Sequence, residues 1–240
     1  MSEKVIGILG GMGPEATLDC FAKIIKNTPA TKDQDHLRVV IDSNPKVPDR
    51  TAAILGKGDS VVPVLVQGSL NLEQAGADFI IIPCVSAHFF LDELRSQIGL
   101  PILSIFDSVA EAIEQDHPGI KTVGFMGTSG TVQGGLFQKR LATGGIKTLV
   151  CDDHHQAQVM AAIYDIKKGR PDRSQSAITA DLIAAAESLI TQGVEGIIAG
   201  CTEIPLALKQ EHLSVTYFDS LLLLARAAIR LSGREPVPLP

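Results

Sequence analysis

The sequence predicts an α/β protein of two similar lobes, each a parallel sheet flanked by helices, related by pseudo-twofold symmetry. Two observations lead to this prediction. Short apolar runs rich in β-branched residues alternate along the chain with longer amphipathic segments, which is typical of parallel sheets with both faces covered. Several of these blocks also recur later in the chain at a nearly constant offset, which indicates an internal repeat.

In the first half of the chain, apolar runs predict strands at residues 5–9, 37–41, 79–82 and 101–103. Apolar residues at helical spacing predict helices at residues 15–26, 60–75, 91–97 and 108–115. Because strands and helices alternate in order, each strand is expected to pair in parallel with its neighbours and to be covered by the helices between them.

The second half follows the same alternation. Strands are predicted at residues 122–126, 147–150, 196–199 and 215–218, and helices at residues 132–142, 157–167, 174–192 and 221–231. Residues 234–240 contain three prolines, which is typical of a loose terminus.

Three blocks match between the two halves. Residues 5–11, 76–84 and 105–108 correspond to residues 122–128, 193–201 and 217–220, at offsets of 117, 117 and 112 residues. Matches that keep their order at nearly one offset indicate a duplicated unit. The sequence therefore predicts lobes at residues 1–117 and 118–240, with the C-terminal helix as a candidate member of the first lobe.

Composition excludes several classes of function. The chain has 240 residues, of which 45% are hydrophobic and 20% charged, and its net charge is −6 with no basic run. A nucleic acid or an anionic membrane surface is therefore not an expected partner. The apolar run at residues 5–9 is too short for a secretory signal, and no stretch is long enough to span a bilayer. The four cysteines are far apart, which favours free thiols in a cytoplasmic protein.

Cys84 and Cys201 occupy equivalent positions in the repeat. Each ends an apolar strand and precedes a helix, so each is expected at the carboxyl edge of its sheet, where open α/β sheets bind ligands. If the lobes face each other, the two thiols oppose one another across an active site between the lobes. The alternative is a small buried apolar side chain, and this is the interpretation for Cys20 and Cys151.

Two opposed thiols suit the inversion of a stereocentre. Proton transfer of this kind needs a base on one face of a carbon atom and an acid on the other, with the roles exchanged in the reverse reaction. A free thiol with a pKa of about 8.5 is only slightly ionised at neutral pH, so the pKa of the thiol that acts as the base has to be lowered by its surroundings. The N-termini of the helices that follow Cys84 and Cys201 supply amide donors and the positive ends of helix dipoles.

A glycine-rich loop at residues 10–17 lies between the first strand and the first helix. It resembles a dinucleotide fingerprint only weakly, because no acidic residue ends the second strand about 20 positions later. A loop whose backbone around Met12 and Gly13 cradles a carboxylate fits better, and residues 127–131, with Thr128 and Thr131, form its counterpart in the second lobe. Cys84, His88 and the pair at residues 154–155 lack the spacing of a metal site, so no metal is expected.

Four motifs together resemble the aspartate/glutamate racemase family, at residues 10–17, 44–50, 83–88 and 200–206. The resemblance extends over essentially the whole chain, and the two cysteine motifs are its most specific parts. It implies a two-lobed, usually dimeric enzyme that needs no cofactor and uses Cys84 and Cys201 as the paired acid and base.

The same resemblance implies that Arg50 and Lys167 hold the distal carboxylate of the substrate. Arg50 is expected in a loop after the second strand, and both residues also suit an ordinary role as surface charges. The chain departs from the family after the first cysteine, where Val85 and Ser86 replace the usual Asn and Thr. Ser86 can still donate a hydrogen bond, whereas Val85 cannot.

The function expected from the sequence is racemisation of an acidic amino acid, aspartate or glutamate, by a homodimer without a cofactor. Donors from the loop amides and from four hydroxyl groups would stabilise the charged intermediate, and Glu203 in the second cysteine motif is a further candidate for substrate binding. The four hydroxyl groups are those of Ser86, Thr128, Thr131 and Thr202. Two alternatives stay open: chemistry of the maleate isomerase or decarboxylase type, and a binding protein without catalysis.

Overall fold

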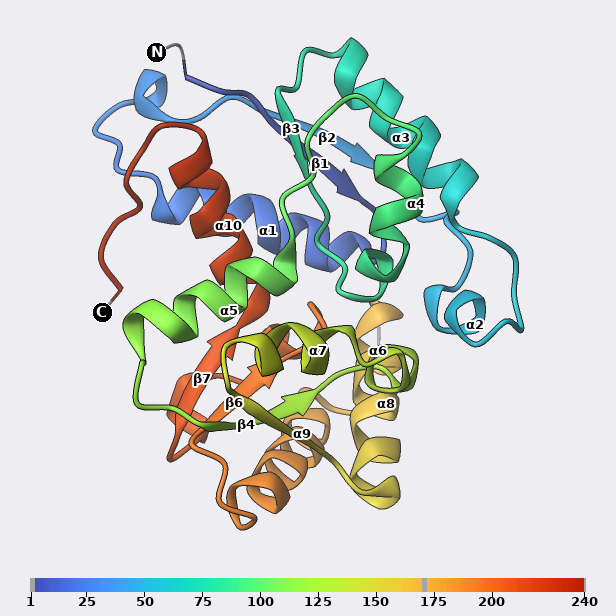
Figure 1. Cartoon of the computed structure of the whole chain (residues 1–240), viewed down its shortest axis with the longest axis vertical. Coiled ribbons are helices and arrows are strands. Elements are labelled where there is room, and N and C mark those ends of the chain that lie inside the picture. The colour runs from blue at the N-terminus through green and yellow to red at the C-terminus, as the bar shows by residue number, and fades with distance from the viewer. Residues whose placement is uncertain (1–2, 170–171, 240) are drawn as a thin grey trace.

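Two parallel sheets form the centres of the two lobes in the computed structural model, which describes residues 3–169 and 172–239 (Figure 1). The first sheet has the order β2-β1-β3, and the second has the order β5-β4-β6-β7. All of their pairings are parallel, so the predicted fold class is confirmed. The strands are β1 (Ile6–Gly10), β2 (Val39–Ser43), β3 (Phe79–Ile81), β4 (Thr122–Met126), β5 (Lys147–Val150), β6 (Gly196–Ala199) and β7 (Thr216–Asp219).

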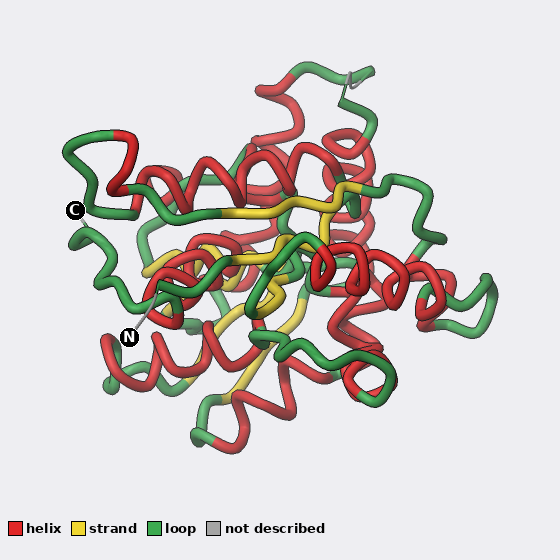
Figure 2. The backbone as a smooth tube through the Cα atoms, turned by 90° about the horizontal axis from the view of Figure 1, so that it is seen from above, coloured by secondary structure: helices red, strands yellow, loops and turns green. Residues whose placement is uncertain are grey.

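Helices surround both sheets, as the view from above shows (Figure 2). Those of the first half are α1 (Pro14–Asn27), α2 (Arg50–Ile54), α3 (Val62–Gln74), α4 (Leu91–Arg95) and α5 (Ile105–Asp116). Those of the second half are α6 (Ser129–Gly134), α7 (Leu136–Thr143), α8 (Asp153–Lys167), α9 (Gln175–Ile190) and α10 (Ser220–Leu231). None of the helices in the described residues is long and apolar enough to cross a membrane.

The strand predicted at residues 101–103 is wrong, because this segment forms only an isolated bridge between Ile102 and Ile80 of β3. Two hydrogen bonds flank the bridge: Ile80 N donates to Pro101 O, and Leu103 N donates to Ile80 O. The segment then ends at Ser104, whose hydroxyl accepts from the amide of Asp107 and caps α5. The bridge lies where β7 lies in the second sheet, so the order of the pairing elements is the same in both lobes.

Two helix predictions also differ from the structure. The helix predicted at residues 132–142 is divided into α6 and α7 at Gly135, where φ is +66°, a conformation that favours glycine. Arg50 was expected in a loop but begins the short helix α2. Asp49 starts that helix because its carboxylate accepts a hydrogen bond from Ala52 N at 2.7 Å.

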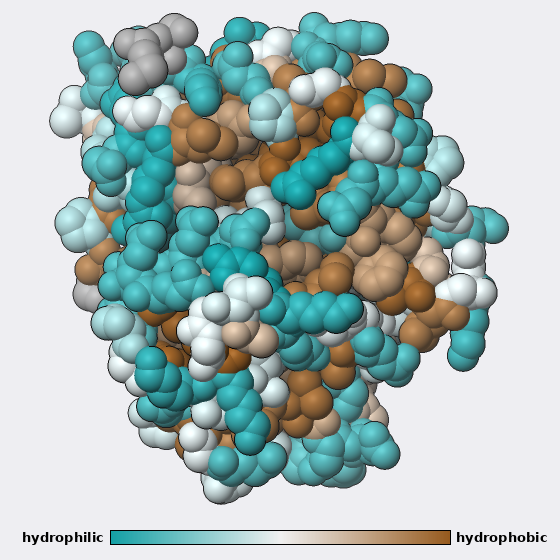
Figure 3. All heavy atoms as spheres, viewed as in Figure 1, coloured by the Kyte–Doolittle hydropathy of each residue, from teal (hydrophilic) through white to brown (hydrophobic). Residues whose placement is uncertain are grey.

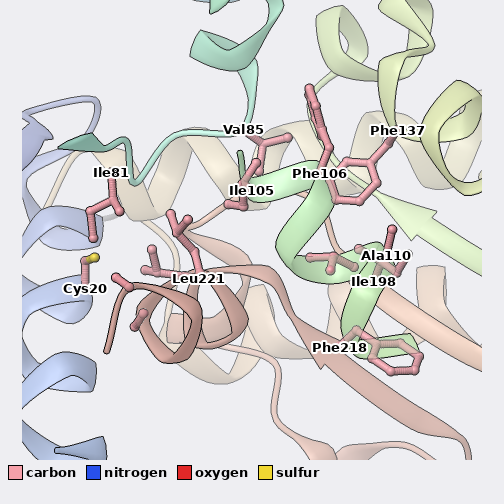
Figure 4. Close-up of a cluster of buried hydrophobic side chains, with 14 of the residues drawn as sticks. Cys20, Ile81, Val85, Ile105, Phe106, Ala110, Phe137, Ile198, Phe218 and Leu221 are labelled. Atoms are coloured by element: carbon pink, nitrogen blue, oxygen red, sulfur yellow. The ribbon is translucent and has the colours of Figure 1, made fainter. Parts of the chain in front are cut away.

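The helices α5 and α10 join the two lobes through one apolar core (Figure 4). Helix α10 packs against α1 and α5, and α5 also packs against α7 of the second lobe. Phe106 of α5 meets Phe137 of α7 edge to face, with ring centroids 4.9 Å apart. Leu221 of α10 belongs to the same buried cluster as Ile81 of β3. This shared core fixes the two sheets so that their carboxyl edges face each other.

Each sheet has a further apolar core on its other face. The first sheet packs there against α3 and α4, and the second sheet packs against α8 and α9. Hydrophilic side chains cover much of the face in Figure 3, with apolar ones between them.

Candidate active site

Cys84 and Cys201 line the same cavity between the lobes. Both follow the strand that pairs with the first strand of their lobe, β3 or β6, and they are 5% and 6% exposed. The cavity has a volume of about 20 Å³, which is room for about one water molecule. Its lining residues are Asp49, Arg50, Thr51, Cys84, Val85, Ser86, Thr128, Tyr164, Lys167, Cys201, Thr202 and Glu203.

The cavity is small because the two lobes meet around its entrance. Helix α2 of the first lobe packs against α6 of the second, and a Cβ added to Gly130 would lie 3.0 Å from Thr51 Cα. Tyr164 of α8 donates from its hydroxyl to Asp49 Oδ2 at 3.4 Å. These contacts hold the two lobes together beside the cavity.

Three hydroxyl groups form a buried cluster beside Cys84. Ser86 Oγ lies 3.1 Å from Thr128 Oγ1 and 2.9 Å from Thr131 Oγ1, and the two threonine oxygens are 2.9 Å apart. The cluster joins the lobes, because Ser86 begins the 3₁₀ helix η2 (Ser86–Phe90) and Thr128 caps α6. Hydroxyl protons can rotate toward an anion, so the cluster can donate to a carboxylate.

Arg50 and Lys167 approach the site from opposite lobes. Arg50 donates to the carbonyl groups of Val47 and Pro48, and its Nη2 lies 3.4 Å from Met12 O. Lys167 ends α8, and its Nζ donates to Met12 O at 3.0 Å and to Glu203 Oε1 at 2.5 Å.

Nearby negative charge stabilises the protonated form of Lys167. Burial by itself would lower the pKa of this ammonium group, but the charges of Cys201, Glu203 and Cys84 outweigh burial and raise the pKa. The positive charge of Lys167 is therefore retained inside the site.

Glu203 is buried, with 1% exposure. Its Oε1 accepts from Gly13 N at 3.1 Å as well as from Lys167. Its Oε2 accepts from the Cys201 thiol at 3.0 Å. Burial and then the charge of Glu203 raise the pKa of Cys201 well above its usual value. Thr202, the residue between them, donates from its hydroxyl to Pro83 O at 3.0 Å and so links the two cysteine segments.

His88 connects the Cys84 segment to α5. Its Nε2 accepts from Ile105 N at 3.2 Å, which leaves the ring proton on Nδ1 to donate to Cys84 O at 2.9 Å. Burial lowers the pKa of His88 to about 4, so the ring is neutral at physiological pH. Both ring nitrogens are occupied, and in residues 3–169 and 172–239 no three His, Cys, Asp or Glu side chains gather in a metal-binding group.

Eight of the eleven predicted site residues line the cavity, whereas Met12, Gly13 and Thr131 do not, and Asp49, Thr51 and Tyr164 are added to the cavity wall. Tyr164 lies one helical turn before Lys167 on α8, so helical spacing could have indicated it. Thr131 is in the hydroxyl cluster, while Met12 and Gly13 contribute through their backbone groups.

A pair of thiols enclosed between two similar α/β lobes, with polar groups pointing inward, defines a two-lobed protein with a small-molecule site. The chain matches the Asp/Glu/Hydantoin racemase family over residues 9–228 and belongs to that family. Racemases are isomerases, so the expectation of an isomerase is confirmed.

Individual relatives cover nearly the whole chain. The broad specificity amino-acid racemase RacX of Bacillus subtilis is 31% identical over 231 residues, which are 94% of this chain and 96% of RacX. Among solved structures, aspartate racemase of Picrophilus torridus has a TM-score of 0.86 and 29% identity, covering 98% of this chain and 96% of that one. Glutamate racemase of Francisella tularensis shares the fold, with a TM-score of 0.68 and 14% identity, over 96% of this chain and 81% of that one.

Proposed function

We propose that the chain is a cofactor-independent racemase of aspartate or glutamate that transfers protons between the substrate and its two active-site cysteines. One observation carries the proposal: Cys84 and Cys201, at equivalent positions in the two lobes, line one small cavity together with cations from both lobes. Racemisation is favoured over maleate-type chemistry and over simple binding, because relatives named as racemases cover nearly the whole chain.

The reaction needs one thiolate and one thiol. The thiolate on one face of the substrate removes the α-proton, so that the Cα–H bond breaks and an S–H bond forms. The thiol on the other face then gives its proton to the α-carbon, and the thiolate that remains serves the reverse reaction. The hydroxyl cluster of Ser86, Thr128 and Thr131 suits the α-carboxylate, where charge increases in the intermediate.

Arg50 and Lys167 suit the distal carboxylate of an acidic substrate. Their donor atoms meet at the carbonyl of Met12, so a carboxylate near that point could pair with both cations. Binding requires opening of the site, because a cavity of about 20 Å³ does not hold an amino acid. Separation of α2 from α6 would admit the substrate, and their return would exclude water and hold the α-carbon between the thiols.

The test is α-proton exchange. The purified protein is incubated with single D- and L-amino acids in deuterium oxide, and loss of the α-proton signal is followed by NMR together with chiral chromatography. Exchange and racemisation of aspartate or glutamate are expected without added pyridoxal phosphate or metal, and after treatment with a chelator. Binding of these amino acids without exchange would overturn the proposal.

Broader specificity is a second candidate. Val85 lines the cavity and offers an apolar contact, the charge of Lys167 is already matched by Glu203, and the relative RacX is named for broad specificity. The same panel decides between the candidates: a preference for neutral amino acids would favour broad specificity.

The homodimer and the cytoplasmic location expected from the sequence stay predictions. Leu18 and Ile25 of α1 and Ile41 of the edge strand β2 are exposed apolar side chains that a second copy could cover. Sedimentation analysis of the purified protein and imaging of a tagged chain in cells test these two predictions.

A further inference from the structure

The two cysteines have different neighbours, although their positions in the repeat are equivalent. The residue two positions after Cys84 is Ser86, whose hydroxyl bonds to Thr128 and Thr131. The residue two positions after Cys201 is Glu203, whose carboxylate accepts the thiol proton at 3.0 Å. The repeat therefore places a neutral hydroxyl group beside one thiol and an acid beside the other.

The Glu203 carboxylate is held firmly in place. One oxygen is bonded by Lys167 Nζ and the amide of Gly13, and the other faces Cys201 Sγ. The side chain is 1% exposed, so water screens its charge poorly. Gly13 belongs to the glycine-rich loop of the first lobe and Lys167 to α8 of the second, which means that closure of the lobes completes this arrangement.

Loss of the proton from Cys201 would place a second negative charge about 3 Å from this carboxylate. Like charges so close in a buried site disfavour ionisation. Of the other charged and titratable groups that line the cavity, Lys167 is already paired with Glu203, Arg50 is bonded to backbone carbonyl groups, and Tyr164 contacts Asp49. The Lys167 charge offsets part of this repulsion at Cys201, but Glu203 is the group whose carboxylate contacts the Cys201 thiol, and Cys84 has no comparable acidic partner in the described part of the chain.

We propose that Glu203 is a positioning residue that holds the proton on Cys201, so that the resting enzyme uses Cys84 as the base and Cys201 as the acid. This inference rests on the proposed function of the site. A turnover that starts in this state puts a proton on Cys84 and takes one from Cys201, so it ends with the thiol and the thiolate exchanged, as the opposite direction requires.

The experiment measures the ionisation of each cysteine separately. The full-length protein is alkylated with iodoacetamide over a range of pH values, and the labelling rates of Cys84 and Cys201 are read from their peptides by mass spectrometry. In the wild type, Cys201 is expected to react more slowly than Cys84 and with a higher pH midpoint. In Glu203→Gln, the pH midpoint of Cys201 labelling should fall by at least one pH unit, while that of Cys84 stays unchanged. At a pH below the midpoint, a fall of one unit raises the thiolate fraction of Cys201 about tenfold.

Two variants separate an electrostatic role from a structural one. Glu203→Asp keeps the negative charge and should keep the high midpoint of Cys201. Ser86→Ala, at the equivalent position of the first lobe, should leave the midpoint of Cys201 unchanged. An unchanged midpoint in folded Glu203→Gln would overturn the proposal. If that variant does not fold, a wild-type midpoint for Cys201 at or below that of Cys84 overturns it equally. Labelling needs no turnover, so this result is independent of whether the enzyme racemises aspartate or glutamate.

Discussion

Arg50 and Lys167, which belong to different lobes, both point their donor atoms at the main-chain carbonyl of Met12, at 3.4 Å and 3.0 Å. This carbonyl belongs to the glycine-rich loop after β1, so one backbone oxygen holds both cations at the edge of the cavity. A substrate carboxylate would compete with a neutral carbonyl for these donors, and a charged acceptor makes the stronger hydrogen bonds.

Removal of either active-site thiol should abolish racemisation in both directions. Because general acid–base catalysis contributes on the order of 10²–10⁴-fold, Cys84→Ala and Cys201→Ala should each lower kcat by at least that factor, while circular dichroism shows a folded protein. Cys20→Ala is the matched control, since burial raises the pKa of Cys20 to about 12 and its side chain lies in the shared core. Turnover close to that of the wild type in either active-site variant would exclude the two-thiol mechanism.

Loss of either cation should lower kcat/KM for acidic substrates more than for neutral ones. Arg50→Ala and Lys167→Ala should lower kcat/KM for aspartate or glutamate about tenfold or more, and Arg50→Lys should also lower it because an ammonium group lacks the bidentate geometry. Activity toward any neutral amino acid should fall much less. Lys168→Ala is the control: this lysine is half exposed and pairs with Asp165 and Asp172. Equal losses on acidic and neutral substrates would assign the cations a structural role.

Closure of the lobes depends on the close approach of α6 to α2. In Gly130→Ala, the new methyl group would lie 3.0 Å from Thr51 Cα, so the entrance should close incompletely and kcat/KM should fall about tenfold. Thermal stability should change little, because alanine favours a helix more than glycine does. Gly119→Ala, where an added Cβ has open space, should behave like the wild type. Full activity of Gly130→Ala would show that this contact is not needed for catalysis.

His88 should make stability dependent on pH. Burial lowers the pKa of its ring from 6.5 to about 4 in the folded chain, so between these values the unfolded chain binds the extra proton. The stabilisation is complete above about pH 6.5 and is lost as the pH falls toward about 4, by up to about 3 kcal/mol. Urea unfolding at pH 7.5, 6.5, 5.5 and 4.5 measures this loss. The free energy of unfolding of His88→Gln should vary less with pH over the same range, and parallel curves would contradict the assignment.

Most of the fold could be predicted from the sequence, because the apolar runs and the repeat reflect burial directly. The same repeat indicated that Cys84 and Cys201 share one site. Other features depend on contacts between distant segments and leave no periodic signal. Glu203 bonds to Gly13, which is 190 residues away, and α2 is too short for helical periodicity to reveal. Residues 101–103 are apolar, as a buried strand would be, but the segment makes only one bridge because Ser104 already caps α5.

The packing of α10 on α1 has a consequence for folding during synthesis. Cys20 and Ile24 of α1 are 0% and 1% exposed, and they share their buried cluster with Leu221 and Leu224 of α10. Helix α10 is synthesised about 200 residues after α1, and the usual rate of synthesis is about 5–20 residues per second. The inner face of α1 therefore remains uncovered while almost all of the second lobe is being made. A ribosome stalled before α10 would hold a first lobe with an open apolar side, which is a surface that a chaperone would recognise.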